Sequence, residues 1–88
     1  MKRVRAVVTG RVQGVGFRYA ANLRAEQFGI SGFVRNLRDG TVEAELQGEA
    51  EAVDSMLEWF SKGPRAAFVE TITSEEIPVT RERGFDIR

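Results

Sequence analysis

The chain contains no cysteine and no histidine in its 88 residues. The lack of cysteine excludes disulfide bonds, a thiolate nucleophile and thiolate metal ligands. The lack of histidine removes the side chain that most often serves as a general base or as a metal ligand. We therefore expect no metal site and no cofactor, and any chemistry has to use other groups.

Long apolar runs are absent as well. No segment is apolar enough to span a bilayer, and the short basic stretch at the N-terminus leads into a predicted strand, not into a signal peptide. We expect a cytoplasmic protein with no membrane partner. Its 88 residues show no repeat or linker, which predicts a single domain over residues 1–88 with one modest core. We expect this domain to be a monomer.

The charges balance, but they are unevenly spread. Thirteen basic and thirteen acidic residues give zero net charge, which argues against non-specific binding of nucleic acid. Residues 1–24 hold six basic residues and no acid, whereas residues 39–58 hold seven acids and no base. Most of these charges are interpreted as ordinary solvated groups. The basic third of the chain nevertheless favours an anionic ligand.

Two segments have the spacing of amphipathic helices. The first begins near Phe17 and is followed by Gly29, a residue typical of the position just after a helix. The second covers about residues 50–62 and is stopped by Gly63-Pro64. The apolar positions that set the two periods are Phe17, Ala21, Ala25 and Phe28 in the first helix and Val53, Met56, Leu57 and Phe60 in the second.

Shorter segments are predicted to be strands. From Arg3 to Thr9, the apolar Val4, Ala6 and Val8 alternate with mostly polar residues, which predicts a strand buried mainly on one face. Asp39-Gly40 is a strong signal for a hairpin between two further strands. The order βαββαβ with a terminal strand predicts an α+β, ferredoxin-like sandwich, in which two helices cover one face of an antiparallel sheet. The predicted strands are, in order, residues 3–9, 32–37, 41–47, 66–73 and 85–87.

The most informative segment is RVQGVGFR (residues 11–18), between the first strand and the first helix. Gly14 and Gly16 allow backbone N–H groups to turn inward around an anion, because no Cβ blocks the unusual φ values or the close approach. The helix N-terminus adds unpaired N–H donors and the positive end of the helix dipole. Arg18 adds a permanent charge with a planar fork of donors suited to phosphate. We interpret the segment as a small phosphate-binding cradle.

The glycine spacing does not match a nucleotide-binding loop. A Walker A loop needs a lysine and a hydroxyl residue after its glycines, and a dinucleotide fingerprint needs a third glycine at position 19, which is Tyr19. A loop this short could hold one phosphate group. The alternative is a tight strand-to-helix turn without a ligand, and Arg18 at the start of the helix favours the cradle.

A second candidate segment is GFVRNLRDG (residues 32–40). Asn36 falls late in a predicted strand, although asparagine is disfavoured in strands. It either satisfies local backbone groups beside the turn or serves as a neutral amide that orients a water molecule. Arg35 and Arg38 are interpreted as surface charges of the hairpin.

Residues 10–18 (GRVQGVGFR) and 32–42 (GFVRNLRDGTV) together closely resemble the paired signatures of the acylphosphatases, and residues 84–88 (GFDIR) are similar to that family's ending. The resemblance covers essentially the whole chain. Phe33, where the family often has tryptophan, and Ala20-Ala21, where bulkier residues are common, depart from it mildly.

This resemblance implies the ferredoxin-like sandwich and the metal-free hydrolysis of acyl phosphates. It implies catalytic roles for Arg18 and Asn36. It also implies phosphate binding by the backbone N–H groups of Gln13, Gly14, Val15, Gly16, Phe17 and Arg18.

The side chains of the sequence suit that reaction. The leaving group of an acyl phosphate is a carboxylate whose conjugate acid has a pKa of roughly 4, so it departs without a general acid. Phosphoryl transfer then needs mainly positioning and charge stabilisation. Arg18 and the loop amides would hold the phosphoryl oxygens, and Asn36 would aim the attacking water. A phosphate oxygen of the substrate would accept the proton of that water.

Two other functions use the same order of elements. A non-catalytic module would bind phosphate or a phosphorylated partner without turnover. An RNA-recognition domain would carry aromatic residues on the exposed face of its central strands, and residues 41–47 contain none. A related domain begins large hydrogenase-maturation proteins, whose work a single domain is not expected to do. We therefore expect a small-molecule acyl phosphate as the partner, and no nucleic acid.

Overall fold

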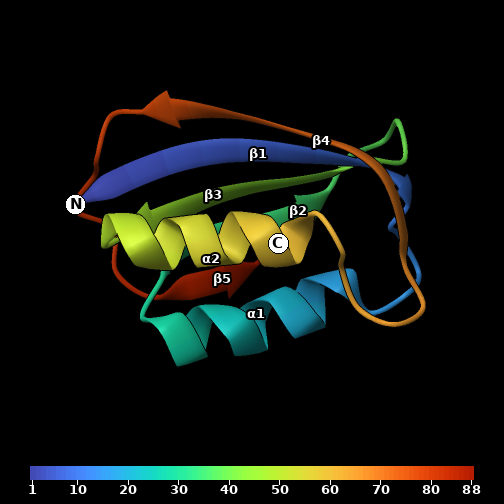
Figure 1. Cartoon of the computed structure of the whole chain (residues 1–88), viewed down its shortest axis with the longest axis horizontal. Helices are drawn as coiled ribbons and strands as arrows, with labels where there is room; N and C mark the ends of the chain where they lie inside the picture. Colours follow the sequence, from blue (N-terminus) through green and yellow to red (C-terminus); the bar gives the residue numbers. More distant parts are fainter.

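Figure 1 shows a computed structural model of the protein, which describes all residues from Met1 to Arg88. Its strands form one sheet in the order β4-β1-β3-β2-β5, and both helices lie on the same side of this sheet. This arrangement confirms the predicted βαββαβ order and the ferredoxin-like sandwich. The elements are β1 (Lys2–Arg11), α1 (Phe17–Phe28), β2 (Ser31–Asn36), β3 (Val42–Gly48), α2 (Ala50–Phe60), β4 (Phe68–Ile77) and β5 (Phe85–Ile87).

The sheet is mixed: its first four strands pair antiparallel, as predicted, and the short C-terminal strand, for which no direction was predicted, runs parallel to its neighbour. β1 pairs antiparallel with β3 and β4, and β2 pairs antiparallel with β3. β5 instead runs parallel to β2, with Phe85 opposite Gly32 and Ile87 opposite Val34. The cause is the path of the chain: after β4 at one edge of the sheet, it passes around the end of the sheet and joins the opposite edge (Figure 1).

The fourth strand also differs from its predicted range of 66–73. It begins at Phe68, because the preceding residues form a turn in which the Ala67 N–H donates to the Pro64 carbonyl at 2.9 Å. It continues to Ile77, since β1 is long enough to pair Arg3 with Ile77. The polar run near its end gives no alternation from which this end could be predicted. The second helix ends at Phe60, two residues before its predicted end.

The core lies between the sheet and the helices and contains the predicted apolar stripes. Phe17 occupies its end nearest the start of α1, with ring centroids 5.3 Å from both Trp59 and Phe60. This aromatic cluster fixes the first turn of α1, which carries a candidate site residue. The fully buried core residues include Ala21 and Ala25 of α1, Val53, Met56 and Phe60 of α2, and Ala6, Val8, Val34, Val42, Ala44 and Leu46 of the sheet. Neither helix has the length and apolar character needed to cross a membrane.

The outer face of the sheet, away from the helices, carries ion pairs. Arg3 is only 2% exposed and Glu43 only 5%, so the interpretation of the charges as solvated groups is wrong for these two. The Glu43 carboxylate accepts hydrogen bonds from the Nε of Arg5 at 2.6 Å and the Nε of Arg35 at 2.5 Å. Long arginine side chains on neighbouring strands cover the carboxylate, a contact that depends on strand register and not on local sequence.

Glu43 predicts a loss of stability in acid. Burial by itself raises the pKa of Glu43, but hydrogen bonds from Arg35 and Arg5 outweigh it and hold the pKa below its ordinary value of 4.5. A carboxylate with a lowered folded-state pKa stabilises the fold above its unfolded pKa and loses this contribution as the pH falls through the folded pKa. We therefore expect the free energy of unfolding to fall below pH 4.5.

Urea titrations over the acid range measure this effect in the wild type and in Glu43→Gln. The variant should lose part of the pH dependence, because its side chain at this position no longer titrates. Glu76→Gln is the matched control, because Glu76 is exposed and belongs to no ion pair. An identical pH dependence in Glu43→Gln and the wild type would contradict the assignment.

Candidate active site

Residues 12–16 form the loop between β1 and α1. Gly14 has a φ of 72° and Gly16 a φ of 78°, both in the left-handed region that L-residues with a side chain rarely adopt. A Cβ added at either position would meet no atom within 4 Å. The backbone conformation therefore requires glycine here, and the space beside the loop stays open.

The loop contains a row of unpaired backbone donors. The N–H groups of residues 13–16 donate to no other group of the chain, and the next backbone hydrogen bond runs from Ala20 N–H to the Gly16 carbonyl at 3.0 Å. The first N–H groups of α1 likewise have no partner within the helix. Gly16 supplies no side-chain cap, and the first turn of α1 contains no acidic residue. The free donors and the positive end of the helix dipole together favour an anion.

The side chain of Gln13 connects this loop to the β2–β3 hairpin. Its Nε2 donates to the Leu37 carbonyl at 2.7 Å and to the Thr41 carbonyl at 2.9 Å. The Leu37 N–H in turn donates to the Thr41 carbonyl at 2.9 Å, which closes the hairpin. Only the backbone N–H of Gln13 was predicted to have a role, and this side-chain role was not predicted. No local pattern signals it, because the partners lie 24 and 28 residues away.

Arg18 lies in the first turn of α1 and is half-buried. Its Nη1 donates to the Arg88 carbonyl at 2.9 Å, and this is its only hydrogen bond within the chain. The Arg88 N–H donates to the Val34 carbonyl on β2 at 2.8 Å. Arg88 therefore links Arg18 to β2, and most of the guanidinium donors remain uncommitted. This link was not predicted.

Asn36 is the last residue of β2. It lies on the same face of the strand as the buried Val34, since side chains alternate along a strand, and so faces the helix layer. Its Oδ1 is buried without a hydrogen-bond partner. Asn36 makes none of the local backbone bonds that the turn-side interpretation requires. The turn is held instead by Asp39, whose Oδ1 accepts from the Thr41 N–H at 3.0 Å and from its hydroxyl at 2.6 Å.

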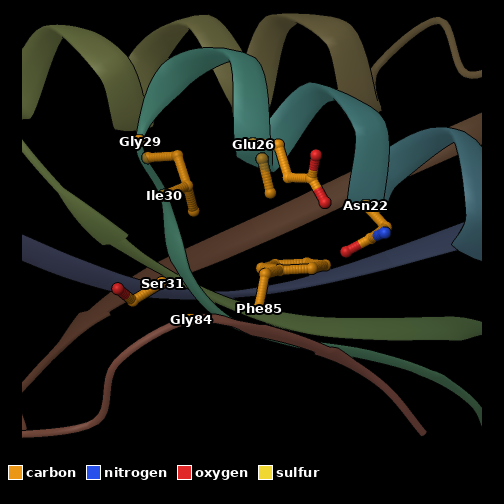
Figure 2. Close-up of a pocket in the computed structure, with 8 residues that line it drawn as sticks. Asn22, Glu26, Gly29, Ile30, Ser31, Gly84 and Phe85 are labelled. Carbon is orange, nitrogen blue, oxygen red and sulfur yellow. The ribbon is translucent and has the colours of Figure 1, made fainter.

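The two connections place the candidate residues at one end of the sandwich. Gln13 ties the loop to Leu37, one residue after Asn36, and Arg88 ties Arg18 to Val34, two residues before it. The glycine loop, Arg18 and Asn36 are thus brought together, although no hydrogen bond joins Arg18 to Asn36. The cleft in Figure 2 lies elsewhere, between the last turns of α1 and the start of β5.

The sequence matches the model of the Acylphosphatase family over residues 4–87. The chain belongs to the acylphosphatase family. The acylphosphatase of Rubrobacter xylanophilus is 53% identical to it over 88 residues, covering 99% of this chain and 80% of that protein. The acylphosphatase of Bordetella parapertussis is 55% identical over 75 residues, covering 85% of this chain and 80% of that protein.

Solved structures of the acylphosphatase family agree with this assignment. The crystal structure of acylphosphatase from Bacillus subtilis matches with a TM-score of 0.97 and 35% sequence identity, covering 100% of this chain and 99% of that chain. The predicted family and the predicted acylphosphatase activity are confirmed.

Proposed function

We propose that the chain hydrolyses acyl phosphates to a carboxylate and inorganic phosphate without a metal ion. The backbone N–H groups of residues 13–18 and the guanidinium of Arg18 bind the phosphoryl group, and Asn36 orients the attacking water. The observation that carries this proposal is the row of unpaired N–H donors in the loop. Beside it lie Arg18, whose side chain makes one hydrogen bond, and Asn36, whose buried Oδ1 makes none.

Binding depends on donors that are already in place. The left-handed conformation at Gly14 and Gly16 and the hydrogen bonds of Gln13 hold the loop before any ligand arrives. A phosphoryl oxygen that accepts from these N–H groups and from Arg18 exchanges its water for fixed, charge-assisted hydrogen bonds. Since no loop donor has to leave a partner within the chain, little reorganisation opposes binding.

Hydrolysis then needs only the placement of one water. The water oxygen attacks phosphorus on the side opposite the acyl oxygen, and the bond between phosphorus and the acyl oxygen breaks with its electron pair leaving on the carboxylate. The side-chain amide of Asn36 hydrogen-bonds the water and aims its oxygen at phosphorus. A phosphoryl oxygen takes the proton of the water. No general acid is needed, because the carboxylate is a weak base.

The test is the hydrolysis of benzoyl phosphate near neutral pH, with and without a chelator. We expect rapid turnover that the chelator does not change. Arg24→Ala is the matched control, because Arg24 is an exposed arginine of the same helix whose side chain hydrogen-bonds only Gln27; it should keep full activity. Loss of turnover on chelation would contradict metal-free hydrolysis. A folded protein that binds inorganic phosphate without turnover would instead be a phosphate-binding module.

A further inference from the structure

The segment between β4 and β5, residues 78–84, is held against the outer face of the sheet by buried polar groups. It passes around the end of the sheet where β1 begins and β3 ends (Figure 1). The Gln47 side chain of β3 accepts from the Thr80 N–H at 2.9 Å and donates to the Thr80 carbonyl at 2.9 Å. Gln47 thus binds the segment as a neighbouring strand would.

Arg3 of β1 is the charged centre of this arrangement. Its guanidinium contacts Glu45 at 2.8 Å and Glu82 at 2.9 Å, and it donates to the Thr80 hydroxyl at 3.2 Å and to Gln47 at 3.0 Å. The side chain of Arg3 is only 3% exposed, so these contacts are little screened by water. Glu82 is the one acidic residue of the crossing segment that Arg3 engages.

Glu82 contacts a second arginine with its other oxygen. Its Oε2 lies 3.3 Å from the Nη2 of Arg88, whose guanidinium carbon also lies 4.1 Å from the ring centroid of Phe33. The hydrogen bond from Arg3 lowers the pKa of Glu82 below its ordinary value, and Arg88 contributes further. The Arg88 side chain therefore lies between a charged carboxylate and an aromatic face.

The backbone of Arg88 reaches the candidate active site. Its N–H donates to Val34 on β2 at 2.8 Å, and its carbonyl accepts from Arg18 at 2.9 Å. Two ion pairs and one hydrogen bond to a main-chain oxygen thus connect Arg3 through Glu82 and Arg88 to Arg18. Of these residues, only Arg18 belongs to the candidate active site.

We propose that Glu82, held by the buried Arg3, is a positioning residue that fixes the Arg18 guanidinium through Arg88. The inference rests on the proposed function of Arg18. A free arginine side chain samples many rotamers and has to lose them when it binds phosphate. Because the main-chain oxygen of Arg88 anchors it, the Arg18 side chain is already oriented when the phosphoryl group binds. Less side-chain entropy is then lost on binding, and the affinity for the phosphoryl group is higher.

The test compares Glu82→Gln with Glu76→Gln, which removes an exposed carboxylate outside any ion pair. The first readout is the NMR resonance of the Arg18 side-chain Nε–H, which reports its environment whether or not the protein turns over substrate. We expect it to shift and broaden in Glu82→Gln only. The second readout is turnover of benzoyl phosphate, where we expect KM to rise about threefold to tenfold with a smaller change in kcat.

Arg88→Met tests the route of the effect. It should reproduce the Arg18 shift, and adding Glu82→Gln to it should change nothing more, because both residues act through one contact. An unchanged Arg18 resonance in folded Glu82→Gln, or additive effects in the double variant, would overturn the inference. A shifted resonance in a protein without turnover would refute the proposed hydrolysis and leave the positioning role intact.

Discussion

Arg18→Ala is expected to abolish phosphate binding and turnover together. Among residues 13–18, whose N–H groups are predicted to bind phosphate, only Arg18 has a positively charged side chain. Its single hydrogen bond to Arg88 leaves the rest of its planar fork for the phosphoryl oxygens. A charge-assisted clamp of this kind is used in the ground state and in the transition state. Its loss should cost on the order of 3–5 kcal/mol of transition-state stabilisation.

The measurement pairs kcat/KM for benzoyl phosphate with the affinity for inorganic phosphate. Both should fall in Arg18→Ala, while the urea midpoint stays near that of the wild type, because Arg18 makes only one exposed contact. Arg24→Ala, which removes a neighbouring arginine from the same helix, should change neither. A folded Arg18→Ala protein that retains phosphate affinity would show that the loop N–H groups suffice for binding and that the arginine has another role.

The two helices and the sheet face that they cover could be predicted, because the patterns that specify them lie within short stretches of sequence. A stripe such as Phe17, Ala21 and Ala25 repeats at the period of a helix, and burial of one stripe against one sheet face leaves few possible arrangements. The outer face was not predictable. The burial of Arg3 depends on which residues oppose it on β3 and on where residues 78–84 cross, and both follow from register and chain path.

The candidate site likewise has a part that local sequence predicts and a part that depends on contacts between distant residues. Gly14, Gly16 and Arg18 lie within one short segment, so their chemistry could be predicted together from their spacing. Asn36 was identified because asparagine is unusual in a strand and because its segment resembles a family signature. The hydrogen bonds of Gln13 to the hairpin and of Arg18 to Arg88 join residues 24 to 70 positions apart. No local pattern encodes such contacts, and they are the ones that hold the site together.

Asn36→Ala is expected to separate catalysis from both binding and stability. The phosphoryl group is held by the loop and Arg18, so affinity for inorganic phosphate should stay near that of the wild type. The water that Asn36 orients reacts only in the chemical step, so kcat should fall on the order of 10²-fold or more with little change in KM. This result is the opposite of the one expected for Arg18→Ala, where binding fails as well.

The unpaired Oδ1 of Asn36 makes the same substitution informative about stability. A buried acceptor without a partner costs about 1–3 kcal/mol, and alanine removes that cost together with the few contacts of the amide. We therefore expect the urea midpoint of Asn36→Ala to equal or exceed that of the wild type, measured beside its kcat. Asn36→Asp keeps the shape of the side chain and adds a negative charge that repels phosphate, so it should raise KM as well. A destabilised Asn36→Ala protein with normal kcat would assign Asn36 to the fold and not to the reaction.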